Sequence, residues 1–246
     1  VWAPMQSPTA VLWAMARALD LDEQAIAVYP TLVGGGFGRK AEVDAVVQAA
    51  SIARKVGRPV QLIWSREEDL AHDVYRPAVA ARLAARIDAR GHVAAFDVRM
   101  AGQSVSHAFT GRQMPLAAPA TPDGTSVQGA IRLPYDFGQR RVTHTAVELP
   151  VPVGFWRSVG HSYTAFFVES FLDELAHQAG LDPLALRMGL LREAPFHRKV
   201  LSAAADQGLG IGIGHDEVDA GKAGLDHVVH RIATGVSVAP RNRVSG

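Results

Sequence analysis

The chain has 246 residues, of which 48% are hydrophobic and 20% are charged, and its net charge is +1. This composition supports a sizeable buried core and excludes a broad basic field of the kind that binds nucleic acid. No apolar run is long enough to span a membrane, and the absence of cysteine excludes disulfides, thiolate zinc sites, cysteine nucleophiles and a cysteine-ligated iron–sulfur cluster within this chain.

The first part of the chain predicts two helices on either side of a glycine-rich turn. Ser7 and Pro8 are typical of a helix start, with serine as the N-cap and proline at the first helical position. The second helix ends at Gly57, which suits the left-handed residue that closes many helices. The expected elements are a helix from Ser7 onwards, a strand over 25–33, a helix over 41–56 and a strand over 59–64.

The second part predicts a β-ribbon, a long loop and two helices. Ser65 and Glu68 form a capping box, and alternating apolar residues on either side of Gly91 predict a hairpin. The expected elements are strands over 78–88 and 92–100, a loop over 101–130, a strand over 140–149, a helix over 162–179 and a further helix that begins at Pro183 with Asp182 as its cap. The helix over 162–179 is expected to bury one apolar face and to turn the other to solvent; the buried residues are Phe167, Phe171, Leu172, Leu175 and Ala176, and the solvent-facing ones are Glu169, Asp173, Glu174 and Gln178. His227 and His230 fall on a further expected strand, three residues apart and therefore on opposite faces.

The turn over residues 34–38 is the most informative stretch, because it has four glycines around Phe37. Such a turn allows positive φ and lets a ligand approach the main chain, whose N–H groups can converge on an anion or oxo group. A second segment, Phe155-Trp156-Arg157, also places aromatic residues beside an arginine ahead of a helix. We expect the two loops to meet at one pocket around an anionic cofactor; the alternative is that Trp156 fills the core and Arg157 forms a surface ion pair.

Other motifs leave a second hypothesis open. Residues 36–41 satisfy the dinucleotide fingerprint G-x-G-x-x-A, although no acidic residue follows at the distance expected for ribose binding. The ten histidines contain no H-E-x-x-H pattern and are interpreted as structural or solvated, so no side-chain metal site is expected. A nucleotide-binding oxidoreductase and a non-catalytic interaction module therefore remain as alternatives.

The ordered combination of motifs resembles the large molybdenum-binding subunit of the xanthine oxidase family of molybdenum hydroxylases. The resemblance extends over about residues 1–198 and is strongest to the isoquinoline oxidoreductase and bacterial aldehyde oxidoreductase branch. The segments that carry it are Gln6, Gly34-Gly35-Gly36-Phe37-Gly38-Arg39-Lys40, Gly57-Arg58-Pro59-Val60, Ser65-Arg66-Glu67-Glu68-Asp69, His72-Asp73-Val74-Tyr75-Arg76-Pro77, residues 154–162, residues 169–176 and Asp182-Pro183-Leu184.

The resemblance implies a molybdopterin-type cofactor, in its cytosine dinucleotide form, whose dithiolene holds the metal in place of protein side chains. In that family the glycine–phenylalanine loop and the aromatic–arginine loop border the molybdenum centre. The residues that the resemblance assigns to the cofactor are Gly35, Gly36, Phe37, Gly38, Arg39, Trp156, Arg157 and Ser158. The implied reaction is oxidation of an aldehyde or N-heteroaromatic compound with oxygen from water.

Two departures limit what is implied. Val159 replaces a phenylalanine that helps many relatives to sandwich flat substrates, and no counterpart of the family's catalytic glutamate is found. We therefore expect a fragment that is inactive alone and needs the remaining half of the molybdenum subunit and an iron–sulfur subunit. The compartment is left open between the bacterial cytoplasm and periplasm. The expected fold is α+β in mixed layers, with a first subdomain over 1–207 and the start of a truncated second one over 208–246.

Overall fold

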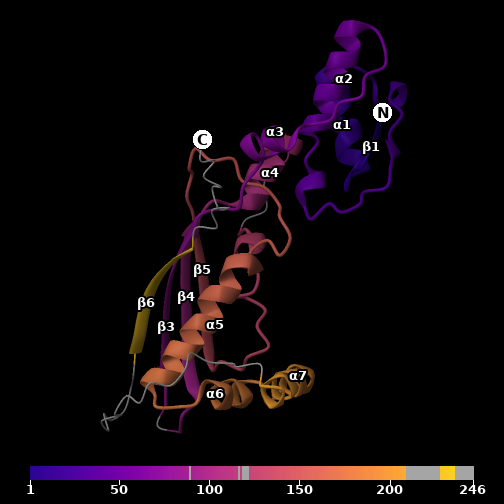
Figure 1. Ribbon diagram of the computed structural model, residues 1–246. Coiled ribbons are helices and arrows are strands. Elements are labelled where there is room, and N and C mark those ends of the chain that lie inside the picture. Colours follow the sequence, from indigo (N-terminus) through magenta and orange to yellow (C-terminus); the bar gives the residue numbers. More distant parts are fainter. Residues whose placement is uncertain (89, 116, 118–121, 209–227, 236–246) are drawn as a thin grey trace, which may run out of the picture. The chain divides into compact units, whose positions relative to one another are not determined.

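The computed structural model describes residues 1–88, 90–115, 117, 122–208 and 228–235 (Figure 1). It contains two compact units, each built from separate stretches of chain. The first unit comprises residues 1–77, 103–125 and 148–159, and the second comprises residues 78–102, 126–147 and 160–246. The predicted boundary between 1–207 and 208–246 adjoins residues 209–227, which lie outside the described ones, and it stays a prediction.

The first unit packs two helices beside a very short parallel strand pair. Strand β1 (Trp2–Ala3) pairs with β2 (Tyr29–Pro30), and helix α1 (Pro8–Leu19) packs on α2 (Asp44–Val56). The buried residues of this core are Met5, Ala10, Val11, Ala14, Met15, Leu19, Val43 and Ala50. The α2 helix ends as predicted at Gly57, which has φ 65°. The 3-10 turns η1 (Glu23–Ala25) and η2 (Arg39–Ala41) complete the segment.

Two predicted strands of this unit were wrong. Only Tyr29–Pro30 of residues 25–33 forms a strand, and residues 59–64 form none. Residues 59–64 lack a neighbouring strand among the described residues, and Ile63 is 78% exposed. Apolar character alone therefore did not produce a strand, because a strand also needs a partner for its backbone hydrogen bonds.

Two short helices in this unit depend on serine caps. The predicted capping box is confirmed: Ser65 Oγ accepts the Glu68 N–H (3.2 Å) and begins α3 (Arg66–Ala71). The expected loop over 101–130 instead contains α4 (Val105–Gln113), where Ser104 Oγ accepts the His107 N–H (3.1 Å). Ser104 also donates to buried Asp123 (2.6 Å), so a local cap produces a helix that lacks apolar periodicity. A 3-10 turn, η3 (Gly124–Val127), follows.

The second unit is built on a four-stranded sheet in the order β5-β4-β3-β6. The predicted hairpin is confirmed as β3 (Val79–Ile87) and β4 (Val93–Gly102), which are antiparallel, although position 89 in its turn lies outside the described residues. Strand β5 (Gln139–Ala146) runs parallel to β4, and β6 (Val228–Gly235) runs antiparallel to β3. Of the two histidines on the expected last strand, His230 lies in β6 and His227 is outside the described residues.

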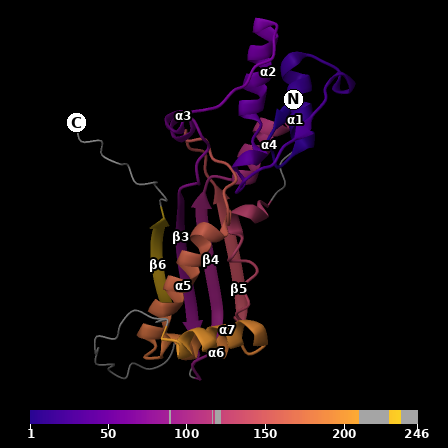
Figure 2. The same ribbon diagram turned by 45° about the vertical axis from the view of Figure 1, so that its right-hand side comes forward.

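Helix α5 (His161–Gln178) lies across one face of this sheet in both views (Figure 1, Figure 2). The apolar stripe predicted for it is buried, and it meets the alternate residues of β3 and β4 that face it. Helices α6 (Pro183–Leu190) and α7 (Pro195–Asp206) follow, and Asp182 caps α6 as predicted by accepting the Ala185 N–H (2.7 Å). The mixed α+β architecture is therefore confirmed. No helix in the described part of the chain combines the length and hydropathy needed to cross a membrane.

An arginine joins α6 to α5. Arg187, whose side chain is 4% exposed, donates to Glu169 (2.9 Å) and Asp173 (2.6 Å), and the Tyr135 hydroxyl donates to the same Glu169 carboxylate (3.0 Å). Burial, followed by the Glu169 charge, raises the pKa of Tyr135, so this hydroxyl stays protonated. The residues predicted to lie on the solvent side of α5 therefore include two that hold the next helix.

We expect Arg187→Met to lower the free energy of unfolding by about 2–3 kcal/mol. Removing the guanidinium leaves two partly shielded carboxylates without their partner, and the partial exposure of Glu169 keeps the loss below that of a fully buried pair. Urea denaturation measures the change, and Arg192→Met is the matched control because Arg192 is exposed and donates to the Gly189 carbonyl of its own helix (3.0 Å). Equal stability of the two variants would contradict the role assigned to Arg187.

Candidate functional site

The loop over residues 34–38, called the glycine loop below, holds its aromatic residue in a strained conformation. Gly34, Gly35 and Gly38 have positive φ, and so does Phe37 at φ 50°. A phenylalanine in this region of φ is uncommon and persists only where its surroundings hold it there. The Phe37 side chain is nevertheless 57% exposed. The loop therefore holds an exposed aromatic ring in a backbone conformation that costs conformational energy.

The segment over residues 155–159, called the arginine loop below, is strained in the same way. Ser158 has φ 76° and Val159 has φ 42°. The Val159 value is unusual because a β-branched side chain strongly disfavours this region. Three of the four non-glycine residues with positive φ in the described chain thus lie in these two loops. Strain of this kind is enriched at functional sites, and its coincidence in both loops marks them as the candidate site.

The two loops are in direct contact, as the sequence predicted. A Cβ added at Gly38 would lie 2.5 Å from the carbonyl oxygen of Phe155 and 3.1 Å from the backbone nitrogen of Trp156. The Arg157 guanidinium lies over the Phe37 ring, 5.4 Å from its centroid, which is a cation–π arrangement. The absence of a side chain at Gly38 therefore allows the backbones to touch.

Gln6 packs against the glycine loop, and residue-by-residue reasoning did not assign it to the site. The Gly38 N–H donates to Oε1 of Gln6 (3.0 Å). A Cβ at Gly36 would lie 2.3 Å from the same oxygen, so this glycine admits the amide. Because Oε1 is the acceptor, the Gln6 NH2 group remains as a donor beside the loop. The signal that could have found Gln6 was its place in the family resemblance.

Arg39, which the resemblance assigned to the cofactor, has its guanidinium bound within the protein. It makes two hydrogen bonds to Asp44 (3.0 and 2.9 Å), contacts Asp73, and lies over the Trp64 ring at 5.7 Å. Burial alone would lower the pKa of Arg39, but the hydrogen bonds and charge of Asp44, together with Asp73, raise it overall. Burial raises the pKa of Asp73 in spite of its contact with Arg39. The stronger ion pair of Arg39 is therefore the bidentate one with Asp44. Arg39 therefore fixes the end of the glycine loop relative to Asp44 and Asp73.

A second arginine stands beside Arg157. Arg76 donates through Nη2 to the Arg157 carbonyl oxygen (2.8 Å). Burial, and then the positive charge of Arg157, lowers the pKa of Arg76. Two guanidinium groups close enough to interact in this way form a local concentration of positive charge that favours an anionic ligand. Arg76 lies in a segment that supported the family resemblance, but no site role was predicted for it.

Trp156 is half-buried and anchors the arginine loop. Its indole Nε1 donates to the Val74 carbonyl oxygen (2.9 Å). The backbone of residues 74–76 adds a bridge between Tyr75 and Val153, with the Tyr75 N–H donating to Pro152 (2.8 Å) and the Gly154 N–H donating to Tyr75 (3.0 Å). Trp156 therefore has the packing role of the simpler alternative, while Arg157 faces Phe37.

A buried carboxylate links the segments that carry the two loops. Glu42, which follows η2, has a side chain 4% exposed and accepts from Arg112 Nη2 (2.6 Å) and Gln113 Nε2 (2.7 Å). The same Arg112 nitrogen donates to the Val153 carbonyl oxygen, just before the arginine loop (2.8 Å). A Cβ at Gly154 would lie 3.1 Å from Glu42 Oε1. Helix α4, missed by the sequence prediction, thus supplies the side chains that tie the loops together.

Within the described part of the chain the site has no metal-ligating cluster, and its three nearby carboxylates are bound by arginines. The described residues contain no group of three or more His, Cys, Asp or Glu side chains that could hold a metal ion. Glu42, Asp44 and Asp73 are all engaged by arginines. The dinucleotide fingerprint also lacks its required setting, because β2 has two residues and α2 begins only at Asp44, after η2.

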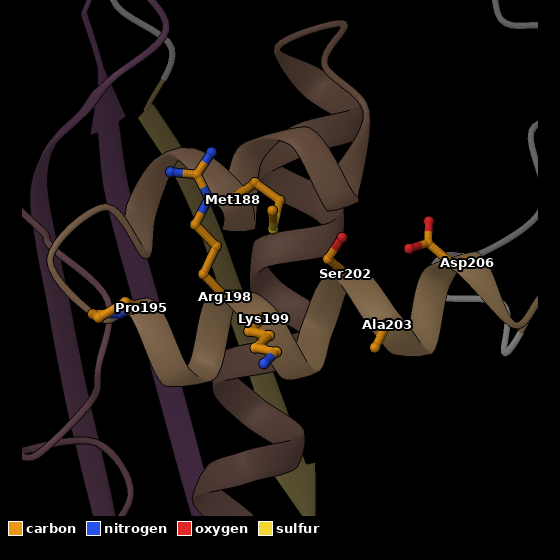
Figure 3. Close-up of a pocket in the computed structure, with 7 residues that line it drawn as sticks. All are labelled: Met188, Pro195, Arg198, Lys199, Ser202, Ala203 and Asp206. Atoms are coloured by element: carbon orange, nitrogen blue, oxygen red, sulfur yellow. The ribbon is translucent and has the colours of Figure 1, made fainter.

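Hollows of about 550, 480, 440 and 230 Å³ in the described chain are lined by no residue of the two loops. One of about 440 Å³ lies between α6 and α7, where Arg198 and Ser202 project on the same side as Met188 (Figure 3). Its lining residues are Met188, Pro195, Arg198, Lys199, Ser202, Ala203 and Asp206. None of these residues has a positive φ, and the hollow presents no paired acid and base. It is therefore a weaker candidate than the loop contact.

We expect Gly38→Ala to separate the two loops and to lower stability by about 2–4 kcal/mol. The change adds a Cβ against the Phe155 carbonyl and places alanine at φ 93°. The matched control is Gly57→Ala, where φ is 65° and no atom lies within 4 Å of the added Cβ, so only the conformational cost of about 1 kcal/mol applies.

Fluorine NMR of protein labelled with 5-fluorotryptophan, combined with urea denaturation, measures both effects of Gly38→Ala. The Trp156 resonance is expected to shift in Gly38→Ala and to stay in place in Gly57→Ala. If Gly38→Ala leaves the Trp156 resonance unchanged and costs no more than the control, the contact between the loops is not tight.

Comparison with known proteins identifies the family. Residues 1–189 match the model of the molybdopterin cofactor-binding domain. The chain is 31% identical over 212 residues to isoquinoline 1-oxidoreductase subunit beta of Brevundimonas diminuta, covering 83% of this chain and 26% of that protein. It is 29% identical over 201 residues to the membrane-bound aldehyde dehydrogenase [pyrroloquinoline-quinone] of Gluconacetobacter polyoxogenes, covering 78% of this chain and 25% of that protein.

The fold is also found in solved structures. Quinoline 2-oxidoreductase from Pseudomonas putida 86 superposes with a TM-score of 0.59 and 23% identity, over 76% of this chain and 23% of that one. The chain spans about a quarter of the length of the curated relatives that it matches. Because the family match extends over most of the sequence, the chain belongs to the molybdopterin cofactor-binding domain family, and its resemblance to the molybdenum-binding subunit of the xanthine oxidase family is confirmed.

Proposed function

We propose that the chain is the part of a molybdenum hydroxylase that contacts the cofactor through the glycine loop and the arginine loop. The single observation that carries this proposal is the backbone contact between Gly38 and Phe155, made by two loops that are both strained. A scaffold that only had to reverse the chain gains nothing from holding Phe37 and Val159 at positive φ. Pre-organisation of main-chain groups around a ligand accounts for that cost.

The residues of the first unit fit a molybdopterin-type cofactor by the chemistry of their donors. Gly36 and Gly38 admit the Gln6 side chain and the arginine loop beside the glycine loop, and Gln6 and Arg157 supply side-chain donors there. Arg76 and Arg157 together suit an anionic group. A cofactor whose own dithiolene holds the metal needs no protein ligands, which agrees with the donor set of the described residues.

The site residues predicted from the sequence divide into two groups under this proposal. Gly35, Gly36, Phe37, Gly38 and Arg157 face the cofactor with main-chain groups, an aromatic ring and a guanidinium. The other three, Arg39, Trp156 and Ser158, position the loops: Arg39 through Asp44 and Asp73, Trp156 through Val74, and Ser158 through its strained backbone.

When bound, such a cofactor supplies oxygen transfer from water and accepts the electrons of the substrate. The contribution of this chain is to bind and orient. The Phe37 ring, exposed and covered on one side by Arg157, offers an apolar surface against which a flat substrate can lie. The amide NH2 of Gln6 can stabilise negative charge that develops on an adjacent oxygen.

The substrate class and the partners follow from the relatives. The names of the relatives refer to isoquinoline in one case and to an aldehyde in another, so we propose an aldehyde or N-heteroaromatic substrate. The proton acceptor, the rest of the cofactor pocket and the electron path would come from the remaining half of the molybdenum subunit and an iron–sulfur subunit. We propose the cytosine dinucleotide form of the cofactor, and no activity for this chain by itself.

Metal analysis of the completed enzyme tests this function. The chain is co-produced with the remaining portion of a molybdenum subunit and an iron–sulfur subunit, and molybdenum is measured by mass spectrometry. We expect about one molybdenum per chain and a loss of at least about fivefold in Arg157→Gln, because charge-assisted contacts to anionic groups are strong. Arg58→Gln is the matched control, since Arg58 is an exposed arginine of the same unit outside the loops.

Three results would contradict the proposal. Absence of molybdenum from the completed assembly would leave the chain as a scaffold without a cofactor. Equal molybdenum content in the Arg157 and Arg58 variants would remove Arg157 from the site. Binding of pyrroloquinoline quinone, which the name of one relative includes, in place of a molybdenum cofactor would replace the cofactor class while keeping the loops as the site.

A further inference from the structure

A hollow of about 230 Å³ in the second unit lies where the turn between β3 and β4 meets α6 (Figure 2). The turn supplies Arg90 and His92 to its lining, α6 supplies Ala185 and Gly189, and Arg192 follows α6. All of these residues belong to the second unit. An inference about this hollow is therefore independent of the proposed cofactor site, which lies in the first unit.

The hollow is lined by more positive than negative groups. Arg90 and Arg192 are both exposed, and no carboxylate of the described residues lies within salt-bridge distance of either one. Arg192 donates through Nε to the Gly189 carbonyl oxygen (3.0 Å), which leaves its two Nη groups for a ligand. Asp136 is the single carboxylate among the lining residues. The balance of charge therefore favours an anion.

Hydrogen bonds hold the backbone on both sides of the hollow. Asp88 Oδ1 accepts the Arg90 N–H (2.8 Å) and the His92 N–H (2.9 Å). The hydrogen bond from the His92 backbone is the main cause of the lowered pKa of Asp88, so this acceptor is ionised at neutral pH. On the other side, the Asp136 N–H donates to the Leu190 carbonyl oxygen at the end of α6 (2.8 Å). The backbone that carries the lining side chains is thus positioned without a ligand.

The remaining lining residues are apolar and belong to the core of the unit. Val93, Leu186 and Leu190 are buried, and Leu181 packs against the same core. A Cβ at Gly91 would lie 3.8 Å from Leu181 Cδ1, an ordinary contact distance, so the turn packs closely on the residue that precedes α6. The hollow therefore joins an apolar surface to cationic groups at its edge.

Gly189 leaves the hollow open at a cost to its own helix. It lies in the last turn of α6, its φ is not positive, and an added Cβ would meet no atom within 4 Å. Glycine supports a helix less well than alanine does, and here neither the backbone conformation nor crowding requires it. Any residue could supply the carbonyl that accepts from Arg192. The one effect specific to glycine at this position is free space in the hollow.

We propose that this hollow binds a small organic carboxylate with a compact apolar body. The carboxylate pairs with Arg90 and Arg192, because a planar guanidinium matches a carboxylate in two hydrogen bonds. The apolar body lies against the side chains of the core. A volume of about 230 Å³ is below the usual range of drug-sized ligand sites and limits the ligand to a small molecule. Inorganic phosphate meets only the charge requirement, because it has no apolar part.

The probe is 4-fluorobenzoate, titrated against the 246-residue chain and followed by fluorine NMR of the ligand. The double variant Arg90→Gln/Arg192→Gln is expected to weaken binding by at least about tenfold, because both charge-assisted pairs are lost. The matched control is Arg82→Gln/Arg140→Gln, which removes the same charge from exposed positions of the same unit that do not line the hollow. This control should bind the probe like the parent chain.

A second variant changes stability and binding in opposite directions. Gly189→Leu is expected to raise the Tm by about 1–3 °C, because leucine is the better helix former, and to weaken probe binding at least about tenfold by filling the hollow. Its matched control is Gly111→Leu in α4, where the glycine is also helical, has no positive φ and has no atom within 4 Å of an added Cβ. Gly111→Leu should bind the probe like the parent chain.

Three results would overturn the proposal. The first is absence of probe binding to the parent chain, and the second is unchanged affinity in either Arg90→Gln/Arg192→Gln or Gly189→Leu. The third is displacement of the probe by an equal concentration of inorganic phosphate, which would show that the hollow recognises charge alone. Loss of binding in Gly189→Leu together with an unchanged or higher Tm excludes unfolding as the cause.

Discussion

The candidate site depends on the close approach of two backbones, which is possible only because Gly38 has no side chain. The carbonyl oxygen of Phe155 occupies the space that a Cβ would fill. This contact requires both loops to be held from behind, and the chain does so with a buried ion pair: Arg112 binds Glu42 beyond the glycine loop and the Val153 carbonyl before the arginine loop. Since Glu42 accepts from two side chains, its charge is neutralised and its oxygens are satisfied, as a buried carboxylate requires.

The distribution of arginines explains which groups remain for a ligand. Arg39 and Arg112 are committed to carboxylates of the protein and define the positions of the loops. Arg157 has its guanidinium over an exposed aromatic ring and its carbonyl held by Arg76. Positive charge is thus neutralised beneath the loops and left uncompensated at their surface. This arrangement favours an anionic ligand at the surface without requiring a basic protein, in agreement with a net charge of only +1.

The sequence predicted local features that depend on local chemistry. The caps at Ser65 and Asp182, the glycine end of α2, the hairpin of β3 and β4 and the buried stripe of α5 are all present. The strands expected over 25–33 and 59–64 depend on distant partners, and the structure supplies only a two-residue pair for the first. Helix α4 was missed because it has almost no apolar periodicity and is fixed by Ser104 and by the contacts of Arg112 and Gln113.

The part of the site that could be predicted from the sequence is the part that depends on its glycine content. Four glycines around Phe37 pointed to a backbone that approaches something closely, and Phe155 proved to be part of it. The roles of Glu42, Arg76 and Gln6 could not be read from composition, because each depends on a partner at least 32 residues away in the chain, as for Gln6 and Gly38. Loops whose geometry is fixed by such distant contacts cannot adopt it until the whole unit has formed, so the ability of the first unit to contact a cofactor is coupled to its folding.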